Sequence, residues 1–213
     1  MELKRVVVTG MGAITPLGNN LSDYWQSLIH GVSGAADITR FDTTHFKTKF
    51  ACEVKNFDPF SFLEKKEVKR YDRFSQFALA ISDEAISHAG LNDENINKER
   101  VGVIWCSGIG GVESFQEEVL RYAAENKIPR FNPFFIPRMI MDIAAGHISI
   151  RNGYRGLNFS VVSACASSTN ALIDAFNYIR LGKANIIVTG GAEAAITPGG
   201  VGGFNALTAL STR

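Results

Sequence analysis

Continuous apolar runs recur along the chain and predict buried strands. They lie at residues 5–9, 101–106, 159–162 and 184–191, and glycine or small polar residues follow most of them. Short runs of this kind, rich in valine and isoleucine, are typical of strands covered on both faces, as in a parallel sheet. Shorter strands are predicted near Phe41 and at 50–54, inside an irregular segment over 31–58.

Segments with helical periodicity separate these runs. In the first of them, residues 19–29, the apolar side chains recur on one helical face. Further helices are predicted at 63–71, 74–88, 112–126, 137–151 and 170–181, and Gly182 ends the last of them. Strands that alternate with helices predict an α/β fold, a mostly parallel sheet with helices on both faces, within one domain over residues 1–213.

Two glycine-rich segments and one aromatic segment interrupt this alternation. Residues 10–18 predict a tight turn, and residues 192–204 predict a loop that wraps back towards the site around Cys165. Residues 129–137 predict a loop that carries Phe131, Phe134 and Phe135. Such an aromatic cluster most often packs in a core, although it could also line an apolar pocket.

Composition narrows the class of protein. Hydrophobic residues make up 46% and charged residues 20% of the 213 residues, which suits a soluble globular protein with a sizeable core. The net charge of +1 gives no indication of a nucleic-acid partner. The three cysteines lack metal-ligand spacing and favour a reducing compartment, and Cys52 and Cys106 are predicted to be packing residues. No uncharged apolar run approaches the roughly 18 residues of a membrane helix, so we expect a cytoplasmic protein.

Cys165 is the strongest candidate for chemistry. It follows the apolar run 159–162 and precedes the helix predicted from Asn170, so it lies at a strand-to-helix junction with small neighbours. Unpaired N–H groups and the helix dipole favour an anion there, which would promote the thiolate and could hold an oxyanion. The alternative is a buried structural cysteine, because free cysteine is among the most buried residue types.

Two other segments carry weaker signals than Cys165. Gly10 and Gly12 resemble the start of a dinucleotide-binding turn, but Thr15 stands where the third glycine belongs, and Pro16 disfavours a helix there. An oxidoreductase would have to bind NAD(P). Elsewhere Lys66, Lys69 and Arg70 share one face of a predicted helix, which is either a solvated face or a basic patch for an acidic partner.

Longer motifs place the chain beside a known family. They are VVVTGMGAITPLG at the start, SGIGG at 107–111, NPFFIPRMI at 132–140, AGHISI at 145–150, SACASS at 163–168, and TGGAEAAITPGGVGGFNALTALSTR at 189–213. Together they resemble the β-ketoacyl-acyl-carrier-protein synthases, most nearly the type II condensing enzymes of bacterial fatty-acid elongation. The resemblance covers the whole chain and implies the thiolase fold, a duplicated βαβαβ architecture in a homodimer.

The resemblance also implies a reaction, a decarboxylative Claisen condensation. Cys165 would take an acyl group from acyl carrier protein, and the enolate formed from malonyl carrier protein would attack that thioester. Ile109 would gate the acyl pocket, Phe135 would line it, and the basic residues from Lys66 to Arg70 would contact the acidic carrier protein. No metal or organic cofactor is implied, since the phosphopantetheine arm belongs to the carrier protein.

One departure limits this expectation. The family uses two histidines and a lysine from its second half, whereas His30, His45, His88 and His147 stand in no matching motif. The resemblance therefore covers roughly the N-terminal half of a synthase, and we expect this chain to self-acylate at most. His147 is predicted to be a packing residue. Alternative functions are a non-catalytic partner subunit that sets chain length, or a module that only binds carrier protein.

Overall fold

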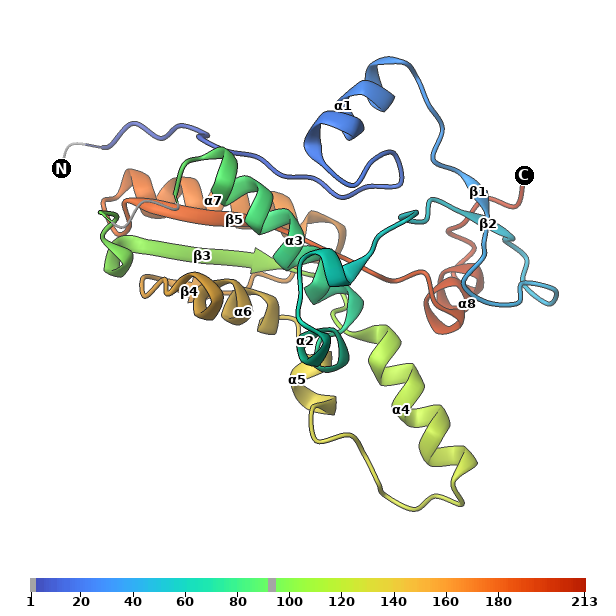
Figure 1. The fold of residues 1–213 in the computed structure, drawn as a ribbon. Coiled ribbons are helices and arrows are strands. Elements are labelled where there is room, and N and C mark those ends of the chain that lie inside the picture. The colour runs from blue at the N-terminus through green and yellow to red at the C-terminus, as the bar shows by residue number, and fades with distance from the viewer. Residues whose placement is uncertain (1–2, 92–94) are drawn as a thin grey trace.

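The computed structural model describes residues 3–91 and 95–213 of the chain (Figure 1). Its helices and strands follow one another in this order: α1 Leu21–Ile29, β1 Ala36–Asp37, β2 Phe50–Ala51, α2 Lys65–Arg70, α3 Arg73–His88, β3 Val101–Cys106, α4 Val112–Ala124, α5 Phe135–Met139, α6 Ile143–Asn152, β4 Asn158–Phe159, α7 Ser167–Arg180, β5 Ile186–Gly191 and α8 Pro198–Ala206. Short 3-10 turns lie at Pro59–Ser61, Lys98–Arg100 and Ala164–Ala166.

A parallel sheet in the order β4-β3-β5 forms the centre of the fold, with helices on both faces (Figure 1). Val103 and Trp105 of β3 pack into a core with α3 and α6, whereas Ile104 and Cys106 pack against α7. This alternation follows from the two-residue period of a strand, and every residue of β3 is buried. The prediction of a covered parallel sheet is confirmed.

The apolar run at residues 5–9 is not a strand, which corrects the prediction made from the sequence. Residues 3–14 are extended but belong to no ladder within the described part of the chain, and Val7 and Val8 are 58% and 77% exposed. The backbone of this segment is held at separate points, where the Lys4 N–H donates to the Arg180 carbonyl at 3.0 Å and the Met11 N–H donates to His88 Nδ1 at 3.2 Å. A strand requires a neighbour that supplies backbone partners along its length, and an apolar run cannot provide one by itself.

Gly10 and Gly12 allow the extended segment to pack closely against α3. The tight turn predicted for residues 10–18 is narrower and lies at Thr15 to Gly18. A Cβ atom at either glycine would collide with backbone carbonyls of α3, so the extended segment lies directly on that helix. The Glu84 carboxylate of α3 accepts hydrogen bonds from the N–H groups of Ala13 and Leu21, each at 2.8 Å. α3 thus fixes both ends of the turn that leads into α1.

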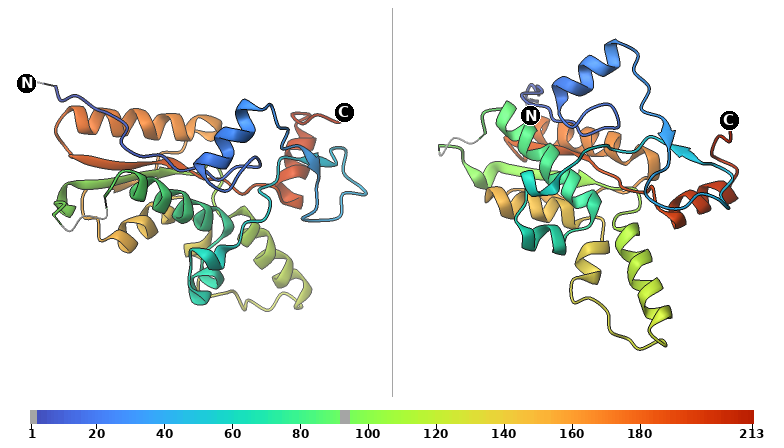
Figure 2. Two further views of the ribbon diagram at one scale, coloured as in Figure 1. Left: turned by 45° about the horizontal axis from the view of Figure 1, so that its top comes forward. Right: turned by 45° about the vertical axis from the view of Figure 1, so that its right-hand side comes forward.

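The helix predicted over residues 137–151 is divided in two. In a continuous helix the Met139 carbonyl would accept from residue 143, but here it accepts from the Gly111 N–H at 3.0 Å. Ile140 is extended and ends α5. Figures 1 and 2 show α4 and the chain after it extending away from the sheet and returning through α5. Phe115, Phe131 and Phe135 stack along this projection.

Two further predictions are corrected near α8, which lies at the same end of the sheet as α4 (Figure 1). The strand expected near Phe41 is absent from the described residues, and the small hairpin there pairs β1 with β2. Part of the glycine-rich loop 192–204 is the helix α8, which begins with Thr197 as N-cap and Pro198 in the first turn. The glycines of α8 allow close contact, since a Cβ atom at Gly199 would lie 2.9 Å from Gln116 Oε1 of α4.

Helix α7 contacts the sheet through its small residues. Ala171 and Ala175 are buried, whereas Leu172, Ile173 and Phe176 are exposed by 52%, 50% and 44%. Helical periodicity alone favours the larger side chains as the buried face. A helix that lies close to a sheet needs short side chains at the contact, and this requirement selects the alanines. Among the described residues, no helix is long and apolar enough to cross a membrane.

Candidate active site

Cys165 lies on the 3-10 turn Ala164–Ala166, between the end of β4 and the start of α7, and its thiol is exposed. Serine and asparagine side chains hold this turn. Ser167 Oγ accepts from the Ser163 N–H at 2.9 Å and donates to the Ala164 carbonyl at 2.7 Å. Asn170 Nδ2 donates to Ser163 Oγ at 2.6 Å. The junction predicted from the sequence is confirmed, although α7 begins three residues earlier than expected.

The backbone immediately before Cys165 is strained. Ala164 has φ +52°, in the left-handed region that costs a residue with a Cβ about 1–2 kcal/mol. The hydrogen bonds from Ser167 and Asn170 offset this cost locally. Strain of this kind is found at sites where a side chain must be presented in one direction. The turn therefore holds Cys165 in one backbone conformation with its thiol exposed.

The first turn of α7 lacks a side-chain cap, although its Ser167 N–H donates to the Ala164 carbonyl. Ala166 is the N-cap residue and provides no side-chain cap, so the leading N–H groups of α7 lack the usual side-chain acceptor. The positive end of the helix dipole lies at the same place. A thiolate or the oxyanion of a tetrahedral intermediate beside this turn would be stabilised by both features.

A second thiol lies beneath the same helix turn. Cys106 is buried at the end of β3, and its Sγ lies 3.5 Å from Ser168 Oγ and 3.1 Å from the Gly190 carbonyl. Burial raises the pKa of the Cys106 thiol, and the hydrogen bond between Cys106 and Ser168 lowers this pKa to a smaller extent. Cys106 is the packing residue predicted from the sequence. Cys52 was predicted to be one as well, but it is exposed.

The loop at residues 107–111 connects β3 to α4 and carries Ile109, which is 43% exposed. A Cβ atom at Gly108 would lie 3.5 Å from the Ala164 carbonyl, so this loop borders the turn that carries Cys165. Gly110 has φ +76°, and a Cβ there would lie 2.6 Å from the Met139 carbonyl. The loop therefore touches both the Cys165 turn and the end of α5, the helix that contains Phe135.

Phe135 lies at the start of α5 within an aromatic row. Its ring is 6.2 Å from that of Phe115 and 5.5 Å from that of Phe131. Phe115 and Phe131 are 48% and 42% exposed, so the row forms an apolar surface rather than part of the buried core. The structure thus brings the helix of Phe135 next to the loop of Ile109, as the sequence-based hypothesis of one pocket requires.

The basic residues lie on α2, whose cations are exposed. Lys66 Nζ is 2.8 Å from Glu64 Oε2, a solvent-exposed pair that adds little to stability. The Arg70 guanidinium lies over the Phe134 ring, 4.7 Å from its centre, and so joins α2 to the segment before α5. Lys69 is exposed at the end of the same helix. A surface with these cations could meet an acidic partner.

Glu193 is a site residue that the sequence-based reasoning did not single out. It follows β5 and its carboxylate accepts hydrogen bonds from the loop that carries Ile109. The signal was available in the sequence, because an acidic residue two positions after a buried strand lies at the carboxyl edge of the sheet. Adjacent parallel strands bring their following loops together at that edge.

His147 packs against the ring of Tyr71, with 4.0 Å between the ring centres. Burial lowers the pKa of His147, which favours the neutral imidazole. This agrees with the packing role predicted from the sequence. Among the described residues, no group of three His, Cys, Asp or Glu side chains is placed to hold a metal ion.

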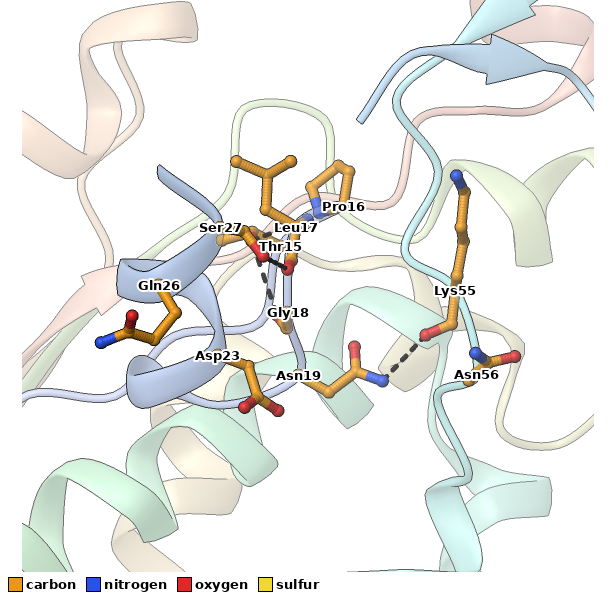
Figure 3. A pocket seen from close by; sticks show the side chains of 10 residues that line it. All are labelled: Thr15, Pro16, Leu17, Gly18, Asn19, Asp23, Gln26, Ser27, Lys55 and Asn56. Atoms are coloured by element: carbon orange, nitrogen blue, oxygen red, sulfur yellow. Dashed lines mark hydrogen bonds between the residues drawn. The ribbon is translucent and has the colours of Figure 1, made fainter. Parts of the chain in front are cut away.

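Three cavities lie away from Cys165. One of about 420 Å³ is formed by the turn from Thr15 to Asn19, by α1 and by Lys55 with Asn56 (Figure 3). A second of about 240 Å³ is bordered by Cys52, Arg73 and the chain after Gly191, and an apolar third of about 410 Å³ lies between β2 and α8. Cys165 borders none of the three.

Comparison with known proteins now identifies the family. The family model described as "Beta-ketoacyl synthase, N-terminal domain" matches residues 3–213, and the chain belongs to this family. Its sheet and helices have the thiolase-like arrangement. Relatives named 3-oxoacyl-(acyl-carrier-protein) synthase 2 include those of Synechocystis sp. PCC 6803, at 45% identity over 100% of this chain, and Staphylococcus aureus N315, at 43% over 98%.

Solved structures agree with the family. A β-ketoacyl synthase from Burkholderia phymatum aligns with a TM-score of 0.86 and 28% identity, covering 99% of this chain and 52% of that one. A type II polyketide acyl-carrier protein in complex with its ketosynthase aligns with a TM-score of 0.85 and 27% identity, covering 100% of this chain and 51% of that one. The chain spans about half the length of the curated relatives it matches.

Proposed function

We propose that this chain carries the acyl-accepting half of a fatty-acid elongation synthase, as one N-terminal domain with Cys165 as the nucleophile. The placement of Cys165 is the observation that supports this most directly. It is an exposed thiol on a hydrogen-bonded turn before α7, in a chain of the β-ketoacyl synthase family. The exposed position removes the main objection raised from the sequence, that Cys165 is a buried structural residue.

The proposed step is transfer of an acyl group from acyl carrier protein. The Cys165 thiolate attacks the thioester carbonyl, and a tetrahedral intermediate forms beside the uncapped first turn of α7. The new carbon–sulfur bond remains on Cys165, while the bond to the phosphopantetheine sulfur breaks. That sulfur leaves with the proton given up by Cys165, so no metal or organic cofactor is needed. Condensation with malonyl carrier protein would follow in the complete enzyme.

The experiment is intact-protein mass spectrometry after incubation with acyl-loaded carrier protein. We expect an adduct of one acyl group in the wild-type chain and in Cys106→Ala, and its loss in Cys165→Ala. Circular dichroism confirms that each variant is folded. A folded wild-type chain that forms no adduct, or an adduct that persists in Cys165→Ala, would overturn the assignment. An adduct would also exclude a non-catalytic partner subunit, the alternative function.

We further propose that acyl carrier protein docks on α2 through Lys66, Lys69 and Arg70. Charge reversal at Lys69 is the cleanest test, because Arg70 also contacts Phe134 and Lys66 is paired with Glu64. We expect Lys69→Glu to weaken binding about three- to tenfold at low salt, and the difference to shrink as salt is added. Lys183→Glu, a charge reversal next to Gly182 after α7, is the matched control. Equal binding by the two variants would contradict the docking surface.

A homodimer is part of the same proposal. The chain exposes two apolar surfaces. One is the row of aromatic side chains on α4 and α5, and the other is formed by the large apolar side chains of α7. Exposed apolar surfaces of this kind often mark interfaces between proteins. Sedimentation of the chain over a range of concentrations tests the dimer, and a strictly monomeric chain would contradict it.

We also propose that Ile109 gates the acyl pocket and that Phe135 lines it.

A further inference from the structure

Glu193 holds the loop at residues 107–111 by its carboxylate. Glu193 Oε2 accepts from the Gly108 N–H at 2.7 Å and from the Ile109 N–H at 3.0 Å. Ser107 Oγ donates to Glu193 Oε1 at 3.2 Å and accepts from the Gly110 N–H at 2.9 Å. Three consecutive backbone N–H groups of the loop are therefore satisfied by two side chains.

These bonds are of the strong kind. Each N–H that donates to an ionised carboxylate forms a charge-assisted hydrogen bond, about twice as strong as a bond between neutral groups. The loop itself has little intrinsic order, since it contains three glycines and no helix or strand. The N–H groups would otherwise turn to water, and the loop would sample other conformations. The carboxylate is thus the main local reason for a single loop conformation.

The loop contacts a different segment of the chain on each of its two sides. On one side Gly108 borders the Ala164 carbonyl of the Cys165 turn. On the other side the Gly111 N–H bonds the Met139 carbonyl at the end of α5. Glu193 itself comes from the chain after β5, so it ties together segments that lie 84 and 85 residues apart in the sequence. Ile109 lies between these two contacts.

We propose that Glu193 is a positioning residue for acyl-chain selection, because it fixes Ile109 relative to Cys165. This inference rests on the proposed function of Cys165. A gate discriminates among chain lengths only if its side chain stays in one place. Loss of the carboxylate frees Ile109, so chains of different length are accepted more evenly. Glu193 does not touch the reacting atoms, and its effect passes through the loop.

The first measurement is hydrogen exchange of the loop, which needs no substrate. We expect the peptide that contains Gly108 and Ile109 to exchange roughly ten- to a hundredfold faster in Glu193→Ala than in the wild type. Glu193→Gln keeps one acceptor and should give an intermediate rate. Glu125→Gln, an exposed glutamate just after α4, is the matched control and should leave the loop unchanged. Unchanged exchange in Glu193→Ala overturns the inference.

The second measurement is the ratio of Cys165 acylation rates with a long and a short acyl chain on the carrier protein. We expect this ratio to move towards one in Glu193→Ala and less so in Glu193→Gln, with Cys165 still acylated. A wild-type ratio in Glu193→Ala overturns the role in selection even if exchange is faster. Absence of any adduct on wild-type Cys165 instead refutes the proposed function, and the exchange rates then still decide whether Glu193 holds the loop.

Discussion

Cys106 and Cys165 both lie near the first turn of α7 but differ in exposure, since Cys106 is buried and Cys165 is exposed. Cys106 ends a fully buried strand, and its Sγ lies 3.5 Å from Ser168 Oγ. Cys165 is three residues before Ser168 and is exposed on a strained turn. The same side chain is therefore a packing group in one place and an available thiol in the other. The position of a cysteine in the fold, buried at the end of a strand or exposed on a turn, therefore decides whether its thiol can react.

The largest expected effect is in reaction with an alkylating reagent. Cys106 can react only when the sheet and α7 open, and its pKa is raised, so little thiolate is accessible. We expect iodoacetamide to modify Cys165 at least roughly a hundredfold faster than Cys106, measured by peptide mass spectrometry over time. Cys52, which is also exposed, provides the reference rate for a thiol without the α7 turn. Similar rates at Cys106 and Cys165 would break the comparison.

The second largest effect is expected on the free energy of unfolding, when Gly191 beside Cys106 is replaced. A Cβ atom at Gly191 would lie 2.6 Å from Cys106 Sγ and would also collide with Ser168 Oγ. We expect Gly191→Ala to lower the free energy of unfolding by about 1–3 kcal/mol, measured by urea denaturation. Cys106→Ala in the same chain should restore part of the loss.

A glycine with free space around it is the control for that substitution. A Cβ atom at Gly146 in α6 would meet nothing within 4 Å. Gly146→Ala should therefore stabilise the chain by about 0.5–1 kcal/mol, through the lower backbone entropy of alanine in a helix. If Gly191→Ala were as well tolerated as Gly146→Ala, the close contact around Cys106 would be contradicted.

The smallest effect is on the pH dependence of stability. Burial raises the pKa of Cys106 in the folded chain, and nearby Glu193 adds to the rise. The neutral thiol therefore contributes fully below the unfolded pKa of about 8.5, and its contribution is lost as pH rises through the folded pKa. We expect the free energy of unfolding to fall less steeply above about pH 8.5 in Cys106→Ala than in the wild type. Parallel curves would show that Cys106 is not desolvated.

Much of the fold follows from local sequence patterns. The buried strands β3 and β5, the helices α3, α4 and α7, and the stop at Gly182 all lie close to the predicted places, because their signals are contained within each segment. The position of Cys165 before a helix is of the same kind. The junction combines an apolar run, small polar residues and a helical period, and each of these can be read without knowing the rest of the chain.

Other elements depended on groups far away in the sequence. Residues 5–9 look like a strand but have no strand partner among the described residues, and α5 separates from α6 because Gly111 takes the Met139 carbonyl. Helix α8 was missed because its glycines were interpreted as a loop, although Thr197 and Pro198 are good start signals. In α7 the contact with the sheet selected alanines over larger side chains.

The sequence by itself determined the strands β3 and β5, the basic face of α2 and the presence of a cysteine at a strand-to-helix junction. Only the tertiary structure decided which cysteines are exposed and that Glu193 grips the loop of Ile109. The physical reason is the distance along the chain over which each effect acts. Propensity and periodicity act over a few residues, whereas burial and hydrogen bonding between loops depend on segments that meet only when parallel strands are placed side by side.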